Sequence, residues 1–302
     1  MITKSPGTRQ NRRVLNLGLL LDVDGPIASP ETRSIAIPSI LDDLVALTAG
    51  GVPIAFITGR SDAFIREQVI EPLLTAGLAD ALAVPGARMF GVYEKGGTWS
   101  TISGSGLGEL TVDESVALPA AFADDIRSLV ESAFADSMFF DATKRAMVSV
   151  EQRADFPADD YKAEQSRFDE AAWAIAERHG LGITWGGRRH EDSAGETPFR
   201  FDDTIISTDI ENRLLDKDRG ARRALEHFGD HGELPTVWRS VGDSRSDYLM
   251  ADALHADGFE VAHVDVRPSD GVLDRPYRVI VEPDGIHDVA GAAFLRHWAA
   301  QL

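Results

Sequence analysis

The 302-residue sequence contains no cysteine, which excludes disulfide bonds, thiolate metal sites and a cysteine nucleophile. It also lacks an apolar run long enough to cross a membrane: the stretch from Val14 to Leu21 ends at Asp22. Basic side chains are few, since 30 Lys and Arg stand against 49 Asp and Glu, a formal net charge of −19. This balance argues against a nucleic-acid partner, as the missing apolar span argues against a membrane. Any anionic substrate must be attracted by local positive charge.

The rest of the composition is ordinary for a soluble globular protein, with 43% hydrophobic and 26% charged residues. The length is sufficient for two domains. Arg12 and Arg13 precede the short apolar stretch, but no small-residue cleavage site follows it. We therefore expect residues 1–13 to form a flexible arm and the protein to be cytoplasmic.

Strand-like runs alternate with helix-like segments at both ends of the chain, the pattern of a parallel sheet with crossover helices. Near the N-terminus, strands are expected to end at Asp22, Thr58 and Val84. The middle of the chain has shorter runs typical of antiparallel strands, and helices are expected there at 119–135 and 166–179.

This pattern predicts an α/β fold with a doubly wound parallel-sheet, Rossmann-like core and an inserted, smaller α+β domain. The core is expected to comprise 14–86 and 210–302, and the inserted domain 87–209.

Polar clusters fall where strands of the predicted core end or a late helix begins, and ligands of open α/β sheets bind at the carboxyl ends of strands. The clusters are Asp22 with Asp24, Thr58, Lys217, and Asp243 with Asp247. Singly, each has a simpler explanation as a turn residue, a helix cap or a surface lysine. Their joint occurrence at such places predicts one site.

The residue types suit phosphoryl transfer. Mg²⁺ prefers oxygen ligands, which Asp22, Asp243 and the backbone carbonyl of Asp24 could supply. Asp22 could attack phosphorus as a carboxylate nucleophile, and Asp24 could protonate the leaving group and then activate water. Thr58 could donate a hydrogen bond to a phosphoryl oxygen, and Lys217 could neutralise the charge on it.

In order and spacing, four segments resemble the motifs of the haloacid dehalogenase (HAD) superfamily: DVDG at 22–25, ITGRS at 57–61, Lys217, and GDSRSD at 242–247. The 159 residues from Thr58 to Lys217 accommodate a type-2 cap domain, and the combination is most similar to the Cof-type, sucrose-phosphatase and trehalose-phosphatase branch. Two positions depart from the common pattern: Pro26 stands where threonine is common, and Asp218 where glycine is frequent.

The resemblance implies a HAD-type phosphoric monoester hydrolase with Mg²⁺ as cofactor. Its substrate would be a small phosphorylated metabolite, above all a sugar phosphate. The implied roles are a nucleophile (Asp22), a general acid/base (Asp24), a phosphate site (Thr58, Gly59, Lys217) and a metal site (Asp22, Asp24, Asp243, Asp247). The alternatives are a sugar phosphomutase, which passes the phosphoryl group to a second hydroxyl, and a non-catalytic ligand-binding relative.

Three arginines are candidate substrate contacts: Arg60 within ITGRS, and Arg153 and Arg188 in the cap. A cluster of arginines suits a second anionic group on the substrate. The simpler explanation for the cap arginines is pairing with nearby surface carboxylates. The sequence leaves the oligomeric state open.

Overall fold

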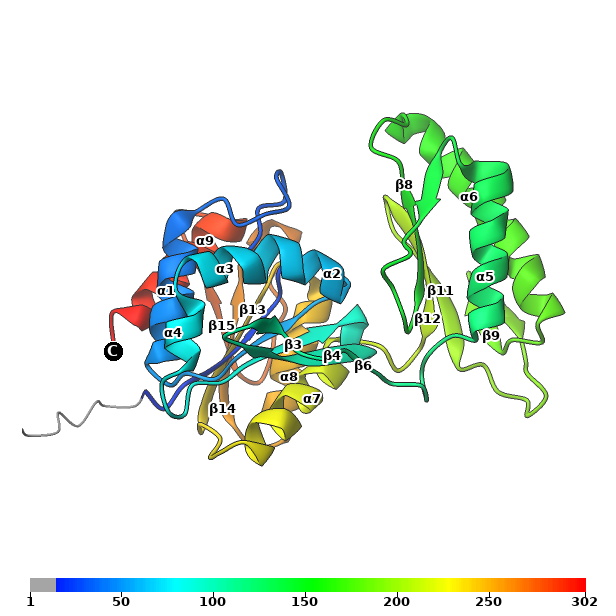
Figure 1. Cartoon of the computed structure of the whole chain (residues 1–302). Helices are drawn as coiled ribbons and strands as arrows, with labels where there is room; N and C mark the ends of the chain where they lie inside the picture. Colours follow the sequence, from blue (N-terminus) through cyan, green and yellow to red (C-terminus); the bar gives the residue numbers. More distant parts are fainter. Residues whose placement is uncertain (1–14) are drawn as a thin grey trace, which may run out of the picture.

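The computed structural model describes residues 15–302, so the predicted arm at 1–13 lies outside the described part of the chain. Figure 1 shows two bodies. Both ends of the chain build an α/β core, and the middle builds a smaller α+β cap beside it. The predicted fold class is confirmed.

Within the described residues, the core sheet has nine strands. They are β1 (Gly18–Leu21), β2 (Ile54–Ile57), β3 (Met89–Tyr93), β4 (Thr98–Ser103), β5 (Gly106–Leu107), β6 (Thr111–Val112), β13 (Val237–Gly242), β14 (Glu260–Asp265) and β15 (Arg278–Val281). Strands β15, β14, β13, β1, β2 and β3 run parallel in that order. Strand β4 returns antiparallel to β3, and both β5 and β6 pair with β4.

Helices cover both faces of this sheet, and the central strands β1 and β2 are apolar throughout. The helices are α1 (Pro38–Ala49), α2 (Asp62–Ile65), α3 (Glu71–Thr75), α4 (Leu78–Leu82), α7 (Lys217–Asp230), α8 (Tyr248–Ala256) and α9 (His287–Ala299). Leu19 and Leu21 of β1 face the layer that contains α1, α3, α4 and α9, whereas Leu20 faces α7 and α8 (Figure 1). A π-helical turn at Arg66–Ile70 joins α2 to α3.

The cap has a hydrophobic core of its own. Its strands are β7 (Met138–Phe140), β8 (Val148–Gln152), β9 (Ile183–Trp185), β10 (Arg188–His190), β11 (Phe199–Asp203) and β12 (Ser207–Asn212), and its helices are α5 (Ala120–Leu129) and α6 (Ala158–Arg178). The strand order in the described residues is β10-β9-β11-β12-β8-β7. Phe122 of α5 and Phe168 of α6 pack with Ile210 of β12. The cap therefore buries its apolar surface internally.

The boundary between the bodies differs from the predicted one at residue 87. Residues 89–112 continue the core sheet, because β3 pairs in parallel with β2 and β4 pairs with β3. The strand expected at 81–84 is absent from the described structure, where α4 and a turn occupy those residues. An alanine-containing apolar run this short fits a helix as well as a strand.

No helix within residues 15–302 combines the length and the apolar character that crossing a bilayer would need.

Candidate active site

The predicted polar clusters converge at one edge of the core sheet. Strands β2, β1 and β13 are adjacent and parallel, so their carboxyl ends lie side by side. Asp22 follows β1, Thr58 follows β2 and Asp243 follows β13. The first residue of α7, Lys217, reaches the same edge and contacts Asp22.

Lys217 is the centre of the site. Its Nζ lies 2.5 Å from Oδ1 of Asp22, 2.8 Å from Oδ1 of Asp247 and 2.8 Å from the carbonyl oxygen of Ile57. The relative exposures are 6% for Lys217, 7% for Asp22 and 0% for Asp247. Burial alone would lower the pKa of the Lys217 ammonium, but the two carboxylates raise it above its usual value. Lys217 is therefore a fixed positive charge.

Three carboxylates gather beside this ammonium group. Asp22, Asp243 and Asp247 each offer an oxygen within 4.8 Å of the others. Burial first, and then the charge of Asp247, raises the pKa of Asp22 well above its usual value and that of Asp243 to about 6. The cluster therefore holds more negative charge than Lys217 balances. Oxygen donors with excess negative charge fit a Mg²⁺ site.

Asp247 also holds the turn after β13 in place. Burial would raise its pKa, but the Lys217 ammonium and hydrogen bonds from Ser244 hold that pKa below its usual value. Its Oδ2 accepts hydrogen bonds from the backbone N–H groups of Asp243 and Ser244 and from the Ser244 hydroxyl. The turn passes so close that a Cβ on Gly242 would lie 2.1 Å from that of Asp247. Asp247 therefore caps the start of a helical turn, as the simpler explanation expected, and also belongs to the acidic cluster.

Asp24 has a different partner. Arg60 donates from Nε to Oδ2 at 3.0 Å and from a terminal nitrogen to Oδ1 at 3.1 Å, which fixes the carboxylate in a bidentate ion pair. The chain turns directly after Asp24, at Gly25. The φ of +95° at this residue and its close approach to Asp243 favour glycine. The Thr58 hydroxyl accepts the backbone N–H of Arg60 at 3.0 Å. Arg60 therefore positions Asp24 as well as lying near the site.

Asp22, Asp24 and Lys217 open onto a cavity of about 260 Å³ between core and cap. Thr58, Asp243 and Asp247 are not among the described residues that line it. Within the described residues, its lining consists of Asp22, Asp24, Gly59, Lys95, Arg200, Asp202, Asp216, Lys217, Ser244 and Ser246. Every side chain in this set is polar, and Gly59 presents backbone. The wall of the cavity contributed by the cap is formed by Arg200 and Asp202 of β11.

Lys95 links the core to the cap. It follows β3, and its Nζ lies 2.8 Å from Oε2 of Glu211, 3.3 Å from Oδ2 of Asp202 and 3.5 Å from Oδ2 of Asp209. These three acids belong to β11 and β12 of the cap. Sequence reasoning missed Lys95 because the third strand was expected at 81–84. With that strand at 89–93, Lys95 would have joined the four polar clusters at the same sheet edge.

A cap segment at 143–147 lies against the ITGRS loop. Lys144 Nζ donates to the carbonyl of Gly59, and the Thr143 hydroxyl lies 2.6 Å from Oγ of Ser61. The buried carboxylate of Glu94 accepts backbone hydrogen bonds from the same segment, including that of Ala146 at 2.8 Å. Core and cap are thus connected by specific polar contacts both at Lys95 and at the 143–147 segment.

Two predicted substrate contacts lie elsewhere. Arg153 pairs with Asp155 at 3.1 Å. Arg188 lies on β10, an outer strand of the cap sheet, and pairs with Glu170 of α6 at 2.7 Å. Neither is among the described residues that line the cavity. Arg188 also stacks on Trp173 at 4.5 Å. Both arginines therefore have local partners, as the simpler explanation expected.

A mainly parallel sheet with a carboxylate cluster at its strand ends, and a cap inserted between its halves, defines the haloacid dehalogenase-like fold. Solved structures share this fold along nearly the whole chain. The C-terminal domain of a C. albicans trehalose-6-phosphate phosphatase aligns with a TM-score of 0.61 over 96% of this chain and 97% of its own, at 12% identity.

Two further structures give the same result. A haloacid dehalogenase-like hydrolase from Bacteroides thetaiotaomicron aligns with a TM-score of 0.55 over 93% of this chain and 98% of its own, at 11% identity. A trehalose-6-phosphate phosphatase related protein has a TM-score of 0.54 over 94% and 97%, at 15% identity. No protein-family model matches the chain, and no curated protein does. At these identities the similarity defines the fold.

Proposed function

We propose that this chain is a Mg²⁺-dependent phosphatase that hydrolyses a small phosphorylated metabolite through an aspartyl-phosphate on Asp22. The observation that carries the proposal is the contact of the buried Asp22 with Lys217 in a cavity that Asp24 also lines. The names of the similar structures, a phosphatase, a phosphatase-related protein and a hydrolase, agree with it.

In the proposed reaction, a carboxylate oxygen of Asp22 bonds to phosphorus as the bond from phosphorus to the leaving oxygen breaks. Asp24 gives the leaving oxygen a proton and later takes one from the water that hydrolyses the aspartyl-phosphate. Lys217 favours the ionised form of Asp22 and stabilises the negative charge of the phosphoryl oxygens, with Thr58 and Gly59 of the ITGRS loop.

The proposed metal site consists of Asp22, Asp243 and Asp247 with the backbone carbonyl of Asp24. When bound there, Mg²⁺ would supply positive charge that keeps the carboxylates ionised and offsets the charge of the phosphoryl group. Asp247 has a second task, because it fixes the turn that carries Asp243.

The cavity lining favours a sugar phosphate among small phosphorylated metabolites. Lys95, Arg200 and Asp202 offer hydrogen-bond donors and acceptors opposite the carboxylate cluster, which suits the hydroxyl groups of a sugar. No aromatic ring is present among the described residues that line the cavity, so a nucleobase would find no stacking partner there.

The test measures phosphate release from a panel of sugar phosphates, with Mg²⁺ and with EDTA. We expect release that requires Mg²⁺ and is abolished by Asp22→Asn. An isomerised sugar phosphate without net release would instead support a phosphomutase. Binding without turnover, unchanged by Asp22→Asn, would support a non-catalytic ligand-binding protein.

A further inference from the structure

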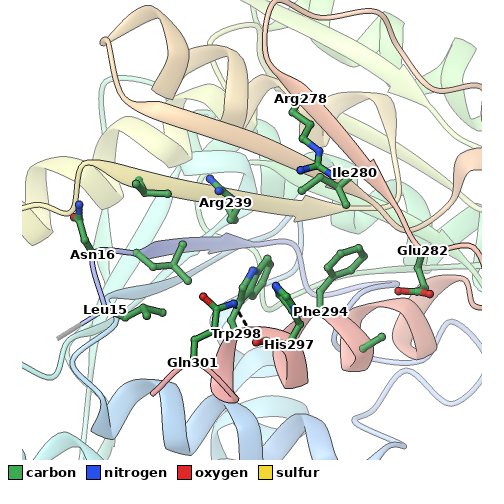
Figure 2. Close-up of a pocket in the computed structure, with 13 residues that line it drawn as sticks. Leu15, Asn16, Arg239, Arg278, Ile280, Glu282, Phe294, His297, Trp298 and Gln301 are labelled. Atoms are coloured by element: carbon green, nitrogen blue, oxygen red, sulfur yellow. Dashed lines mark hydrogen bonds between the residues drawn. The ribbon is translucent and has the colours of Figure 1, made fainter. Parts of the chain in front are cut away.

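A second cavity, of about 540 Å³, lies on the core away from the acidic cluster (Figure 2). Leu15 and Leu17 border it just before β1 begins, whereas Asp22 follows the end of that strand. The opposite wall is the second half of α9. This cavity is therefore separate from the proposed catalytic site and shares no lining residue with it.

The sheet register brings two arginines together in this cavity. Arg239 of β13 pairs with Ala262 of β14, and Ala262 pairs with Arg278 of β15. Residues in register on parallel strands face the same side, so both arginines project from one face with their Cα atoms about 10 Å apart. The residue between them in the register, Ala262, has a small side chain and is buried.

Neither guanidinium is paired with a carboxylate. Within residues 15–302 no acidic oxygen lies within 4.0 Å of either one, and residues 1–14 contain no aspartate or glutamate. Burial, and also the nearby charge of Arg278, lowers the pKa of Arg239, while Glu260 acts in the opposite direction without forming an ion pair. Arg239 donates one hydrogen bond to the carbonyl oxygen of Trp238 at 2.7 Å, and Arg278 is exposed. Both guanidinium groups therefore keep free donors in a chain with a net charge of −19.

The remaining walls are apolar and hydrogen-bonding. Figure 2 shows Arg239 and Arg278 on the sheet side, and Phe294, His297 and Trp298 of α9 across the cavity. Leu17 and Ile280 complete the apolar surface. One carboxylate, that of Glu282, also lines the cavity. Glu282 follows Arg278 by four residues, so their Cα atoms are about 13 Å apart if the chain stays extended. The cavity is within the size range of small-molecule sites.

We propose that this cavity binds a small organic anion with one carboxylate or phosphate-type head group on a flat apolar body. Arg239 and Arg278 would donate charge-assisted hydrogen bonds to the head group, and the body would lie against Phe294 and Trp298. The proposal is independent of the proposed phosphatase function, because no residue of the acidic cluster takes part.

The test is isothermal titration calorimetry on the full chain with three probes of similar shape. They are 1-naphthoate, 1-naphthylphosphonate and the neutral 1-naphthamide. We expect one or both anions to bind and the amide to bind at least about tenfold more weakly, the effect of losing one charge-assisted hydrogen bond. Comparing the two anions identifies the head group.

Variants locate the binding. Arg239→Gln and Arg278→Gln are each expected to weaken anion binding about tenfold or more, whereas Arg178→Gln on the exposed surface of the cap leaves it unchanged. Asp22→Asn is also expected to leave it unchanged, which separates this site from the catalytic proposal. In ¹⁵N-labelled wild type, the indole N–H signal of Trp298 should shift on titration while that of Trp173 in the cap does not. The proposal is overturned if neither anion binds, or if binding survives both cavity substitutions with no shift at Trp298.

Discussion

Asp22 and Asp247 are buried carboxylates on two sides of a single ammonium group, that of Lys217. One positive charge does not balance two negative charges, and Asp243 adds a third within 4.8 Å. The raised pKa values of Asp22 and Asp243 reflect their burial and this excess negative charge. A bound divalent cation would remove the excess, so the charges of the residues themselves support the proposed metal site.

Asp24→Asn is expected to separate the two halves of the proposed reaction. A p-nitrophenolate leaving group needs no proton, so Asp22 should still be phosphorylated, whereas the water that completes hydrolysis loses its base. Rapid mixing with p-nitrophenyl phosphate should therefore release a burst of about one nitrophenolate per site, followed by turnover about 100-fold slower than wild type.

The matched control for this burst is Asp257→Asn, an exposed carboxylate beyond α8, which should keep wild-type turnover. Slow turnover without a burst would contradict the prediction, because Asp24 would then be needed before the aspartyl-phosphate forms.

At the residue level, the sequence could identify Asp22, Thr58 and Asp243, because each directly follows a predicted strand of the parallel sheet. It could not predict that Arg60 holds Asp24. That contact joins two loops 36 residues apart, and it depends on the turn that the chain makes at Gly25.

Helix α7 must lie close to the sheet for Lys217 to reach Asp22. Gly220, one turn into the helix, allows this approach, since a Cβ there would lie 2.4 Å from Cγ2 of Ile57. Gly220→Ala is therefore expected to lower the free energy of unfolding by about 1–3 kcal/mol, measured by urea denaturation.

The same helix provides the control. A Cβ added at Gly229 would meet a side-chain carbon of Leu234 at 3.9 Å, an ordinary van der Waals contact. Gly229→Ala should therefore be neutral or stabilise by up to about 1 kcal/mol. Equal effects of the two substitutions would mean that helix propensity, and not contact with β2, decides the cost.

A second contact of α7 predicts a pH dependence. His227 stacks on Phe90 of β3 with ring centroids 4.0 Å apart, and burial, followed by His231, lowers the pKa of His227 to about 4. The unfolded chain would bind the proton near pH 6.5 and the folded one only near pH 4. The stability that the neutral His227 contributes is therefore fully present above about pH 6.5 and is lost as the pH falls toward 4.

His227→Phe retains a ring against Phe90 and cannot be protonated. Between pH 7 and pH 4.5 the free energy of unfolding of wild type should fall by about 1–2 kcal/mol more than that of the variant. Urea denaturation at each pH measures this difference. His227→Gln should show the same reduced pH dependence at lower stability, which separates charge from packing. If the free energy of unfolding of both variants fell with pH as steeply as that of wild type, His227 would not be the group responsible.

The elements differed in how far they could be predicted. Strands β1 and β2 are buried on both faces and bounded by polar turns, so their apolar runs identified them. The run at 81–84 was ambiguous by itself and belongs to α4 and a turn. Helix α6 begins at Ala158, eight residues before its predicted start, because its first turns are polar and partly exposed.

At the scale of the whole molecule, the cavity exists only because the cap lies over the strand ends. The sequence predicted an inserted cap from the 159 residues between Thr58 and Lys217. It could not predict which cap residues face the core, because that depends on how the cap sheet is ordered and oriented. Arg153 and Arg188 were chosen by residue type alone, and the sheet places Arg200 and Asp202 at the cavity instead.

The ion pairs of Lys95 are expected to hold the cap in this position. Glu211 has no exposed side-chain surface, so Lys95→Met would leave that buried carboxylate with Arg200 as its remaining partner at 2.7 Å. Truncating one partner of a buried charge pair at an interface weakens the contact substantially, here by about tenfold or more.

Lys95→Met should therefore loosen the cap in the free protein. Hydrogen exchange of the amides at 145–147, which donate to Glu94, is expected to accelerate about tenfold or more, and KM should rise more than kcat falls. Lys162→Met removes an exposed lysine of the cap and should leave the exchange rate, KM and kcat unchanged. If KM rises while exchange at 145–147 stays at the wild-type rate, Lys95 contacts the substrate without holding the cap. Because exchange is measured without substrate, the two roles are distinguished even if the substrate proves not to be a sugar phosphate.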